Sequence, residues 1–197
     1  MSDSSGCLAP SLNLSYPGRV KDVTSNNFGV LIAYLVPGVT ALWGLSSFSP
    51  SLRVWFASTP NDAPTISGFL YLTVASLTVG MTVTAIRWAC LDLAHAATGL
   101  TAPDLDFSQL PGKVDAYNLL IEIHYRHYQF YSNMFVATAI TWICHRISSQ
   151  PPCQITWIDP GFVLVEAIFF LTSRDTLRRY FRRTEQLLSP QRGSFGT

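Results

Sequence analysis

Two long runs without a charged residue constrain this chain more than any other feature of its sequence. Residues 28–48 and residues 66–86 are each twenty-one residues long, and neither run contains Asp, Glu, Lys or Arg. A helix rises about 1.5 Å per residue, so each run is long enough to cross a hydrocarbon core about 30 Å thick. The pattern predicts a helical protein that is solvated in part by lipid.

The composition agrees with this prediction. Charged residues make up 13% of the 197 residues, which is about half of the usual share in a globular domain. The mean hydropathy is +0.25. Aromatic residues reach 13% and the formal net charge is +1, which argues against a disordered chain and against a nucleic-acid-binding protein with a strongly basic surface. We therefore expect a small integral membrane protein.

Two further segments are shorter or less uniform. Residues 130–145 are too few to cross a bilayer alone, but the amphipathic helical pattern of residues 114–129 continues into them and completes the crossing. The other segment, residues 155–173, contains Asp159 followed by Pro160. Aspartate is a common helix-capping residue, and proline suits the first position of a helix. We expect an all-α, polytopic membrane protein with four transmembrane helices, and three spans is the alternative. The four predicted spans are residues 28–48, 66–87, 130–145 and 155–173.

Basic residues fall mostly on one side of this arrangement. Arg53 and Arg146 lie on one side, and the other eleven of the 13 Lys and Arg residues lie on the side that holds both termini. Because cytoplasmic segments carry the excess of basic residues in multi-pass proteins, we expect both termini to lie in the cytoplasm. A flexible tail (residues 1–27) would precede the spans. A basic tail (residues 174–197) would continue the fourth span as a helix.

A stripe of small and hydroxylated residues follows one face of the second span at spacings of three and four. It consists of Thr73, Ser76, Gly80, Thr84 and Arg87. Small residues at this spacing allow two helices to pack closely. The same hydroxyls also suit the lining of an aqueous path, with Arg87 at its cytoplasmic mouth. Four helices are too few to enclose such a path, so a pore would require an oligomer.

Two single residues interrupt the predicted spans. Glu166 places a carboxyl group near the middle of the fourth span, where a charge is expensive and marks either a structural hydrogen bond or a gating role. Pro37 lies within the first span and removes one backbone donor. The carbonyl that it frees then needs a partner from a neighbouring helix.

Two predicted helices offer a charged surface to the cytoplasm. In the amphipathic helix of residues 114–129, Glu122 and Arg126 stand four residues apart in the favourable order for an ion pair. Four of the six arginines in the basic tail lie close together: Arg178, Arg179, Arg182 and Arg183. We expect these groups to contact anionic lipid or an acidic partner protein.

No catalytic motif and no nucleotide-binding motif occurs in the chain. We therefore expect no enzymatic activity and no cofactor. No sequence motif supports a nucleic acid or a nucleotide as the signal. Glu122, His124 and His127 cannot converge on a metal from one regular helix, so no metal site is expected. Cys144 and Cys153 lie near the predicted outer side, where free thiols and a disulfide are both possible.

In size, span count and basic cytoplasmic helices, residues 28–188 resemble the small multi-span membrane subunits of bacterial anti-phage defence systems of the Hailong and Kiwa type. The resemblance implies a homo-oligomer, often a tetramer, that acts as a channel or as a membrane sensor coupled to a soluble protein. Our first expectation is an oligomeric, channel-like effector of the bacterial inner membrane that permeabilises or depolarises this membrane on a cytoplasmic signal. The alternative is a non-conducting anchor or sensor scaffold for a cytosolic partner, and an intramembrane enzyme comes third.

Overall fold

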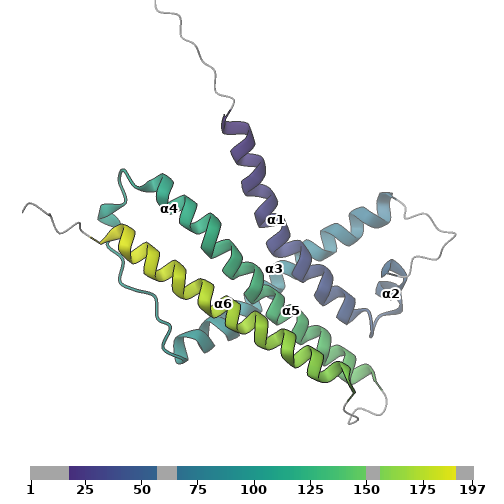
Figure 1. The fold of residues 1–197 in the computed structure, drawn as a ribbon. Coiled ribbons are helices and arrows are strands. Elements are labelled where there is room, and N and C mark those ends of the chain that lie inside the picture. Colours follow the sequence, from purple (N-terminus) through teal and green to yellow (C-terminus); the bar gives the residue numbers. More distant parts are fainter. Residues whose placement is uncertain (1–17, 57–65, 150–155, 190–197) are drawn as a thin grey trace, which may run out of the picture.

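The computed structural model describes residues 18–56, 66–149 and 156–189, and these residues form helices and no strand (Figure 1). The all-α class is therefore confirmed. The four long helices are α1 (Gly18–Leu45), α3 (Ile66–Ala97), α5 (Arg126–Ser148) and α6 (Ile158–Leu188). The shorter elements are α2 (Pro50–Phe56), the 3₁₀ turn η1 (Phe107–Gln109), α4 (Val114–Leu120) and the π-helical turn η2 (Ile121–Tyr125).

The helix ends follow local signals in most places. The α3 helix ends at Ala97, and Gly99 follows in the left-handed region with φ of +83°. The N–H of Leu100 then donates to the carbonyl of His95, which closes the helix in the manner of a Schellman cap. By contrast, α1 begins at Gly18, inside the segment predicted as a flexible tail; residues 1–17 of that tail lie outside the described part.

The α5 helix lies at the centre of the arrangement and contacts α1, α3 and α6. In Figure 1 the C-terminal ends of α3 and α6, together with α4, lie toward one side of the molecule. The C-terminal ends of α1 and α5, and the N-terminal ends of α3 and α6, lie toward the other side. The core between α1, α3 and α5 is built from small side chains: Ala41, Val83, Val136 and Ala137.

Glycines let the backbone of α1 touch its neighbours directly. A Cβ atom added to Gly38 would lie 1.8 Å from the carbonyl oxygen of Ser76 in α3, and one added to Gly80 would lie 2.1 Å from the carbonyl oxygen of Tyr34 in α1. Gly44 approaches Thr141 of α5 in the same way. Close packing of this kind holds helices together in lipid, where burial of apolar surface supplies little driving force.

Pro37 lies within α1, and α5 repairs the gap that it leaves. Because proline has no N–H, the carbonyl of Ala33 one turn earlier lacks its helical donor. The Asn133 side chain of α5 donates to that carbonyl through Nδ2 at 3.1 Å, and Asn133 is fully buried. The expected rescue by a neighbouring helix is therefore present.

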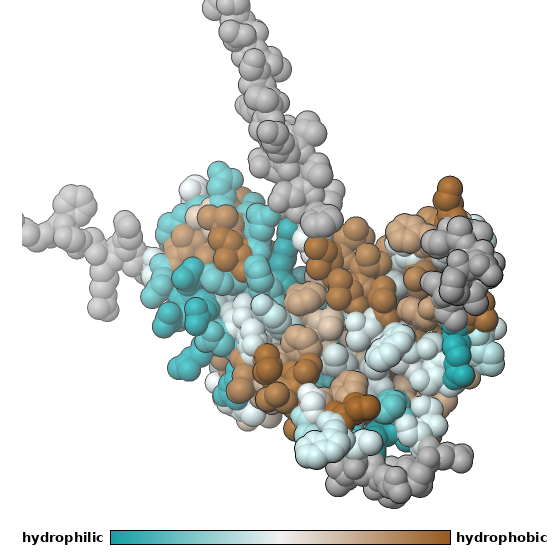
Figure 2. Space-filling view, turned by 45° about the vertical axis from the view of Figure 1, so that its right-hand side comes forward, coloured by the Kyte–Doolittle hydropathy of each residue, from teal (hydrophilic) through white to brown (hydrophobic). Residues whose placement is uncertain are grey.

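The α3 helix is the one helix in the described part that is long and apolar enough to cross a membrane, judged by length and composition. Only 17% of its most apolar stretch is buried within the chain, whereas the core helix of a soluble protein is mostly buried. Residues Leu31–Leu45 of α1 form a shorter apolar helix. Figure 2 shows apolar side chains over much of one face and hydrophilic side chains gathered near α4 and the end of α6. One long apolar helix is weak support for an association of the chain with a membrane.

Candidate functional site

The stripe on α3 faces the interior of the protein. Ser76 and Arg87 are fully buried, and the Gly80 backbone lies against α1. Thr73 and Thr84 are half-buried, and their hydroxyls donate within their own helix to the carbonyls of Phe69 and Gly80 at 2.8 and 3.0 Å. Within one copy of the chain, this geometry corresponds to the helix-packing alternative.

Arg87 reaches from α3 into a group of polar side chains on α5. Its Nη1 donates to the hydroxyl of Ser132 at 3.3 Å, and its guanidinium lies 5.2 Å from the centre of the Tyr128 ring. The Tyr128 hydroxyl donates in turn to the carboxylate of Asp92 on α3. This bond makes the ring richer in electrons, which favours a cation on its face. Asp92 thus compensates the buried positive charge through Tyr128.

A second polar contact ties α3 to α6. The Ser173 hydroxyl donates to the carbonyl of Phe170 at 2.9 Å, so its oxygen accepts from Nε2 of His95, 3.3 Å away. The His95 ring stacks on the Phe170 ring with centroids 5.3 Å apart. We refer to Arg87, Asp92, His95, Tyr128, Ser132 and Ser173 as the Arg87 cluster.

The Arg87 cluster holds more donors and acceptors than it pairs. Nε and Nη2 of Arg87 and Nδ1 of His95 are buried and have no hydrogen-bond partner in the described part of the chain. A buried polar group without a partner is costly, so such sites usually hold water. The cluster can therefore accept ordered water between α3 and α5.

Glu166 lies on α6 opposite α5. Both of its carboxylate oxygens are buried and have no hydrogen bond to another described residue. The hydroxyl of Thr138 on α5 donates to the carbonyl of Met134 at 2.7 Å. The side chain of Asn133 donates to the carbonyl of Ala33 in α1. Neither side chain therefore donates to the Glu166 carboxyl group.

Beyond the apolar stretches, the segment formed by α4, η2 and the start of α5 lies beside the C-terminal half of α6. We call residues 114–128, packed against residues 174–188, the distal hairpin. The hydroxyls of Tyr117 and Tyr180 lie 3.3 Å apart, and the rings of Tyr125 and Tyr180 have centroids 5.4 Å apart. Lys113 donates to the carbonyl of Leu187 at 2.7 Å and so satisfies the end of α6. The basic tail is thus fixed in one orientation up to residue 188.

The four arginines between residues 178 and 183 are exposed, and they occupy one face of α6. At about 100° per residue, Arg178, Arg179, Arg182 and Arg183 cover an arc of roughly 140°. The opposite face carries the buried side chains of Leu177, Thr184 and Leu188. We refer to these four residues as the arginine face. Asp175 pairs with Arg179 at 2.8 Å, and both side chains are more than half exposed.

Arg183 also connects the two arms of the distal hairpin. Its Nη1 donates to Nε2 of His124 at 2.8 Å. Partial burial of His124, and then the positive charge of Arg183, lowers the pKa of this imidazole. The neutral ring is therefore the form that the contact requires, because only a neutral Nε2 can accept from arginine.

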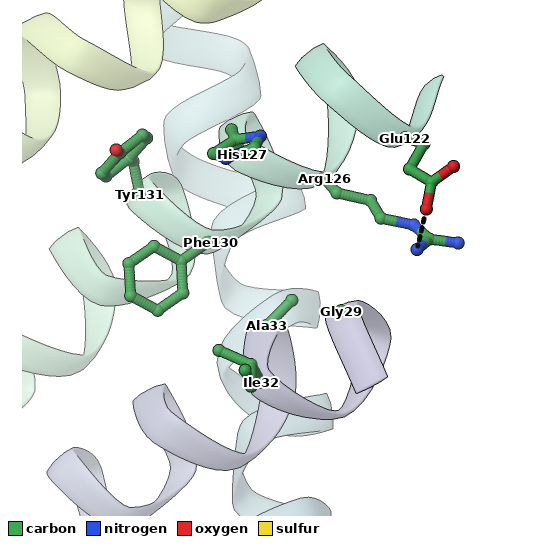
Figure 3. A pocket seen from close by; sticks show the side chains of 8 residues that line it. All are labelled: Gly29, Ile32, Ala33, Glu122, Arg126, His127, Phe130 and Tyr131. Carbon is green, nitrogen blue, oxygen red and sulfur yellow. Dashed lines mark ion pairs between the residues drawn. The ribbon is translucent and has the colours of Figure 1, made fainter. Parts of the chain in front are cut away.

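The π-helical turn η2 places Glu122 and Arg126 at a pocket. The N–H of Arg126 donates to the carbonyl of Ile121, five residues earlier, which widens the helix by one residue. Arg126 Nη1 lies 3.6 Å from Oε1 of Glu122. Both residues line a pocket of about 460 Å³ between α1 and α5 (Figure 3). The sequence periodicity gave no signal for the π turn, because apolar residues at spacings of three and four in this segment also fit a regular α-helix.

Other candidate chemistry has a simpler explanation in the described residues. No three His, Cys, Asp or Glu side chains gather there to hold a metal ion. His127 donates from Nδ1 to the carbonyl of Ile123 at 2.5 Å, while His124 accepts from Arg183. Cys144 is a buried free thiol, and Cys153 lies outside the described residues.

Comparisons with known proteins leave these features to be interpreted on their own. No protein-family model, no curated protein and no solved structure matches this chain.

Proposed function

We propose that this chain is a multi-pass membrane anchor that presents the distal hairpin to an acidic cytosolic partner. The observation that carries the proposal is the arginine face, four exposed guanidinium groups held on one side of a helix whose other side is packed. A helix packed in this way presents charges in a fixed pattern, so little ordering entropy is lost on binding. Arginine forks also suit carboxylate groups on a partner.

The arrangement of the helices supports insertion by four spans with both termini in the cytoplasm. The α1 helix ends on the side where α3 begins, and the ends of α3, α5 and α6 alternate between two sides of the molecule (Figure 1), as consecutive crossings require. The α6 helix continues fifteen residues beyond Ser173, a distance of about 22 Å. The arginine face therefore lies at and beyond the headgroup region, within reach of a soluble protein.

The decisive experiment combines crosslinking with a measurement of membrane potential in the same cells. A photo-crosslinking amino acid in place of Gln186, on the exposed side of α6, should yield one protein adduct in cells that express the wild-type chain. Changing all four arginines of the arginine face to glutamate should abolish the adduct and leave the protein in the membrane fraction. Expression should not depolarise the cells. Depolarisation without an adduct would overturn the anchor proposal.

The channel-like effector is the second candidate, and unpaired polar atoms in the interior favour it. Both carboxylate oxygens of Glu166, Oδ1 of Asn133 and Nη2 of Arg87 are buried without partners in the described part. Water at these atoms would create polar positions along α3, α5 and α6. A conducting path would still require a homo-oligomer, such as a tetramer, because one copy is too thin to enclose it.

Two variants test the second candidate. Glu166→Gln keeps the shape of the side chain and removes its charge. If the carboxylate gates the path, this substitution should alter the ion flux from proteoliposomes that a dye reports. Thr73→Leu combined with Thr84→Leu would reduce the flux if the stripe on α3 lines the path. Wild-type protein that shows no flux would leave the anchor as the function.

A further inference from the structure

The pocket between α1 and the start of α5 has an apolar end and a charged end (Figure 3). The apolar wall is formed by Ile32 and Ala33 of α1 and by Phe130 and Tyr131 of α5. The charged end carries Arg126, His127 and Glu122. The volume of about 460 Å³ falls within the usual range for small-ligand sites, about 300–1,000 Å³. The pocket suits an amphipathic molecule with a polar head.

The apolar wall continues beyond the pocket. Ile32 is 36% exposed, and Val36, one turn further along α1, is 38% exposed. An acyl chain that enters along Ile32 can therefore follow α1 toward the other apolar residues that face outward. Arg126 lies one turn before Phe130, where the predicted third span begins. This placement at the cytoplasmic boundary rests on the membrane insertion proposed above.

We propose that this pocket binds one anionic phospholipid. Its phosphate contacts Arg126, and an acyl chain lies against Ile32 and Phe130. A planar guanidinium can bind a phosphate through two parallel hydrogen bonds. The cytoplasmic leaflet is the leaflet that faces this end of the chain under the proposed topology, and anionic lipids attract basic groups there.

The neighbouring groups define how the headgroup is held. Glu122 already pairs with Arg126 at 3.6 Å, so the carboxylate and the lipid phosphate compete for the same guanidinium. Because Nδ1 of His127 donates to the carbonyl of Ile123, the neutral ring keeps Nε2 as an acceptor. A headgroup hydroxyl, such as the glycerol of phosphatidylglycerol, can donate to it. The pocket thus favours an anionic headgroup that also carries hydroxyls.

Native mass spectrometry of the full-length protein in neutral detergent tests the proposal. Phosphatidylglycerol should bind with one high-affinity site, and phosphatidylcholine should bind more weakly. Arg126→Gln should weaken phosphatidylglycerol binding about fivefold, which corresponds to about 1 kcal/mol. Glu122→Gln should strengthen it, because the competing carboxylate is removed. A misfolded variant could not produce that gain.

Arg179→Gln is the matched control. Arg179 also pairs with an acidic residue four positions away on a helix, but it does not line the pocket. Its replacement should leave the high-affinity site unchanged. An equal loss in Arg179→Gln and Arg126→Gln would reduce the effect to general charge attraction and overturn the assignment. Competition by inorganic phosphate at the same concentration as the lipid would assign the site to a free anion instead.

A photo-crosslinking residue in place of Ile32 identifies the occupant directly. An adduct with lipid supports the proposal. An adduct with a second copy, with another protein or with the chain's own N-terminal segment would overturn it. If the protein were not retained in the membrane fraction, the proposed function would fail as well. If it were retained but Arg126→Gln bound lipid like the wild type, only the pocket assignment would fail.

Discussion

Replacing Gly80 by alanine should force α1 and α3 apart. A Cβ atom at this position would lie 2.1 Å from the carbonyl oxygen of Tyr34, and ordinary contacts begin near 3.4 Å. The helices must therefore separate by about 1.3 Å, because the obstructing atom belongs to the backbone and cannot rotate away. Gly38→Ala meets the same obstacle from the other side, with 1.8 Å between its Cβ and the carbonyl oxygen of Ser76.

The expected cost combines two opposing effects. Overpacking of a close contact destabilises by about 1–3 kcal/mol, and alanine recovers up to about 1 kcal/mol of helix propensity relative to glycine. We expect a net loss of about 1–2 kcal/mol in the free energy of unfolding for Gly80→Ala. One separation of the helices relieves both clashes. The combined Gly38→Ala and Gly80→Ala variant should therefore lose much less than the sum of the two.

Unfolding in mixed micelles, followed by circular dichroism, measures these differences. Gly161→Ala is the matched control, because a Cβ atom added to Gly161 on α6 meets nothing within 4 Å. This variant should be neutral or more stable than the wild type. If Gly80→Ala matched Gly161→Ala in stability, or if the two clashing substitutions were additive, the direct backbone contact between α1 and α3 would be refuted.

Two further predictions use the same unfolding measurement. Asn133→Ala should lower the free energy of unfolding by about 1–3 kcal/mol, because the buried carbonyl of Ala33 loses its donor. This loss should be smaller in a Pro37→Ala background, where the backbone N–H is restored. Equal losses in both backgrounds would contradict the pairing. For His124, whose pKa is lowered from 6.5 by burial and by Arg183, stability should be fully present above pH 6.5 and fall as the pH drops through the lower folded value. His124→Gln should flatten this pH dependence, and an unchanged profile would exclude His124 as its source.

The sequence predicted those elements that depend on local pattern. The continuation of residues 114–129 into the third apolar segment follows from periodicity, and the need of the Ala33 carbonyl for a partner from a neighbouring helix follows from Pro37. The start of α1 at Gly18 was missed because residues 18–27 lack the apolar periodicity that marks a helix. Contacts between helices decide the remaining features, and one sequence does not report them.

The burial of Arg87 could not be predicted from the sequence. It stands directly after an uncharged run, a position that usually places a cation at the membrane surface. The structure buries it completely because Tyr128, forty-one residues later, lies across its guanidinium and brings Asp92 to the same place. The amphipathic pattern placed Tyr128 on an apolar face, but nothing in the sequence paired it with Arg87.

A continuous line of aromatic contacts joins the distal hairpin to this buried charge. Ring centroids lie 5.4 Å apart between Tyr180 and Tyr125 and 6.0 Å apart between Tyr125 and Tyr128, and Arg87 lies over the Tyr128 ring. Packed side chains resist displacement, so a partner that moves α6 at Tyr180 should also displace Arg87. A double-mutant cycle between Tyr180→Leu and Arg87→Met should then give a coupling of at least about 0.5 kcal/mol between residues that do not touch. If the losses in the free energy of unfolding were additive, the distal hairpin and the Arg87 cluster would respond independently. In that case, a partner bound to the hairpin could not affect the membrane helices through these aromatic contacts.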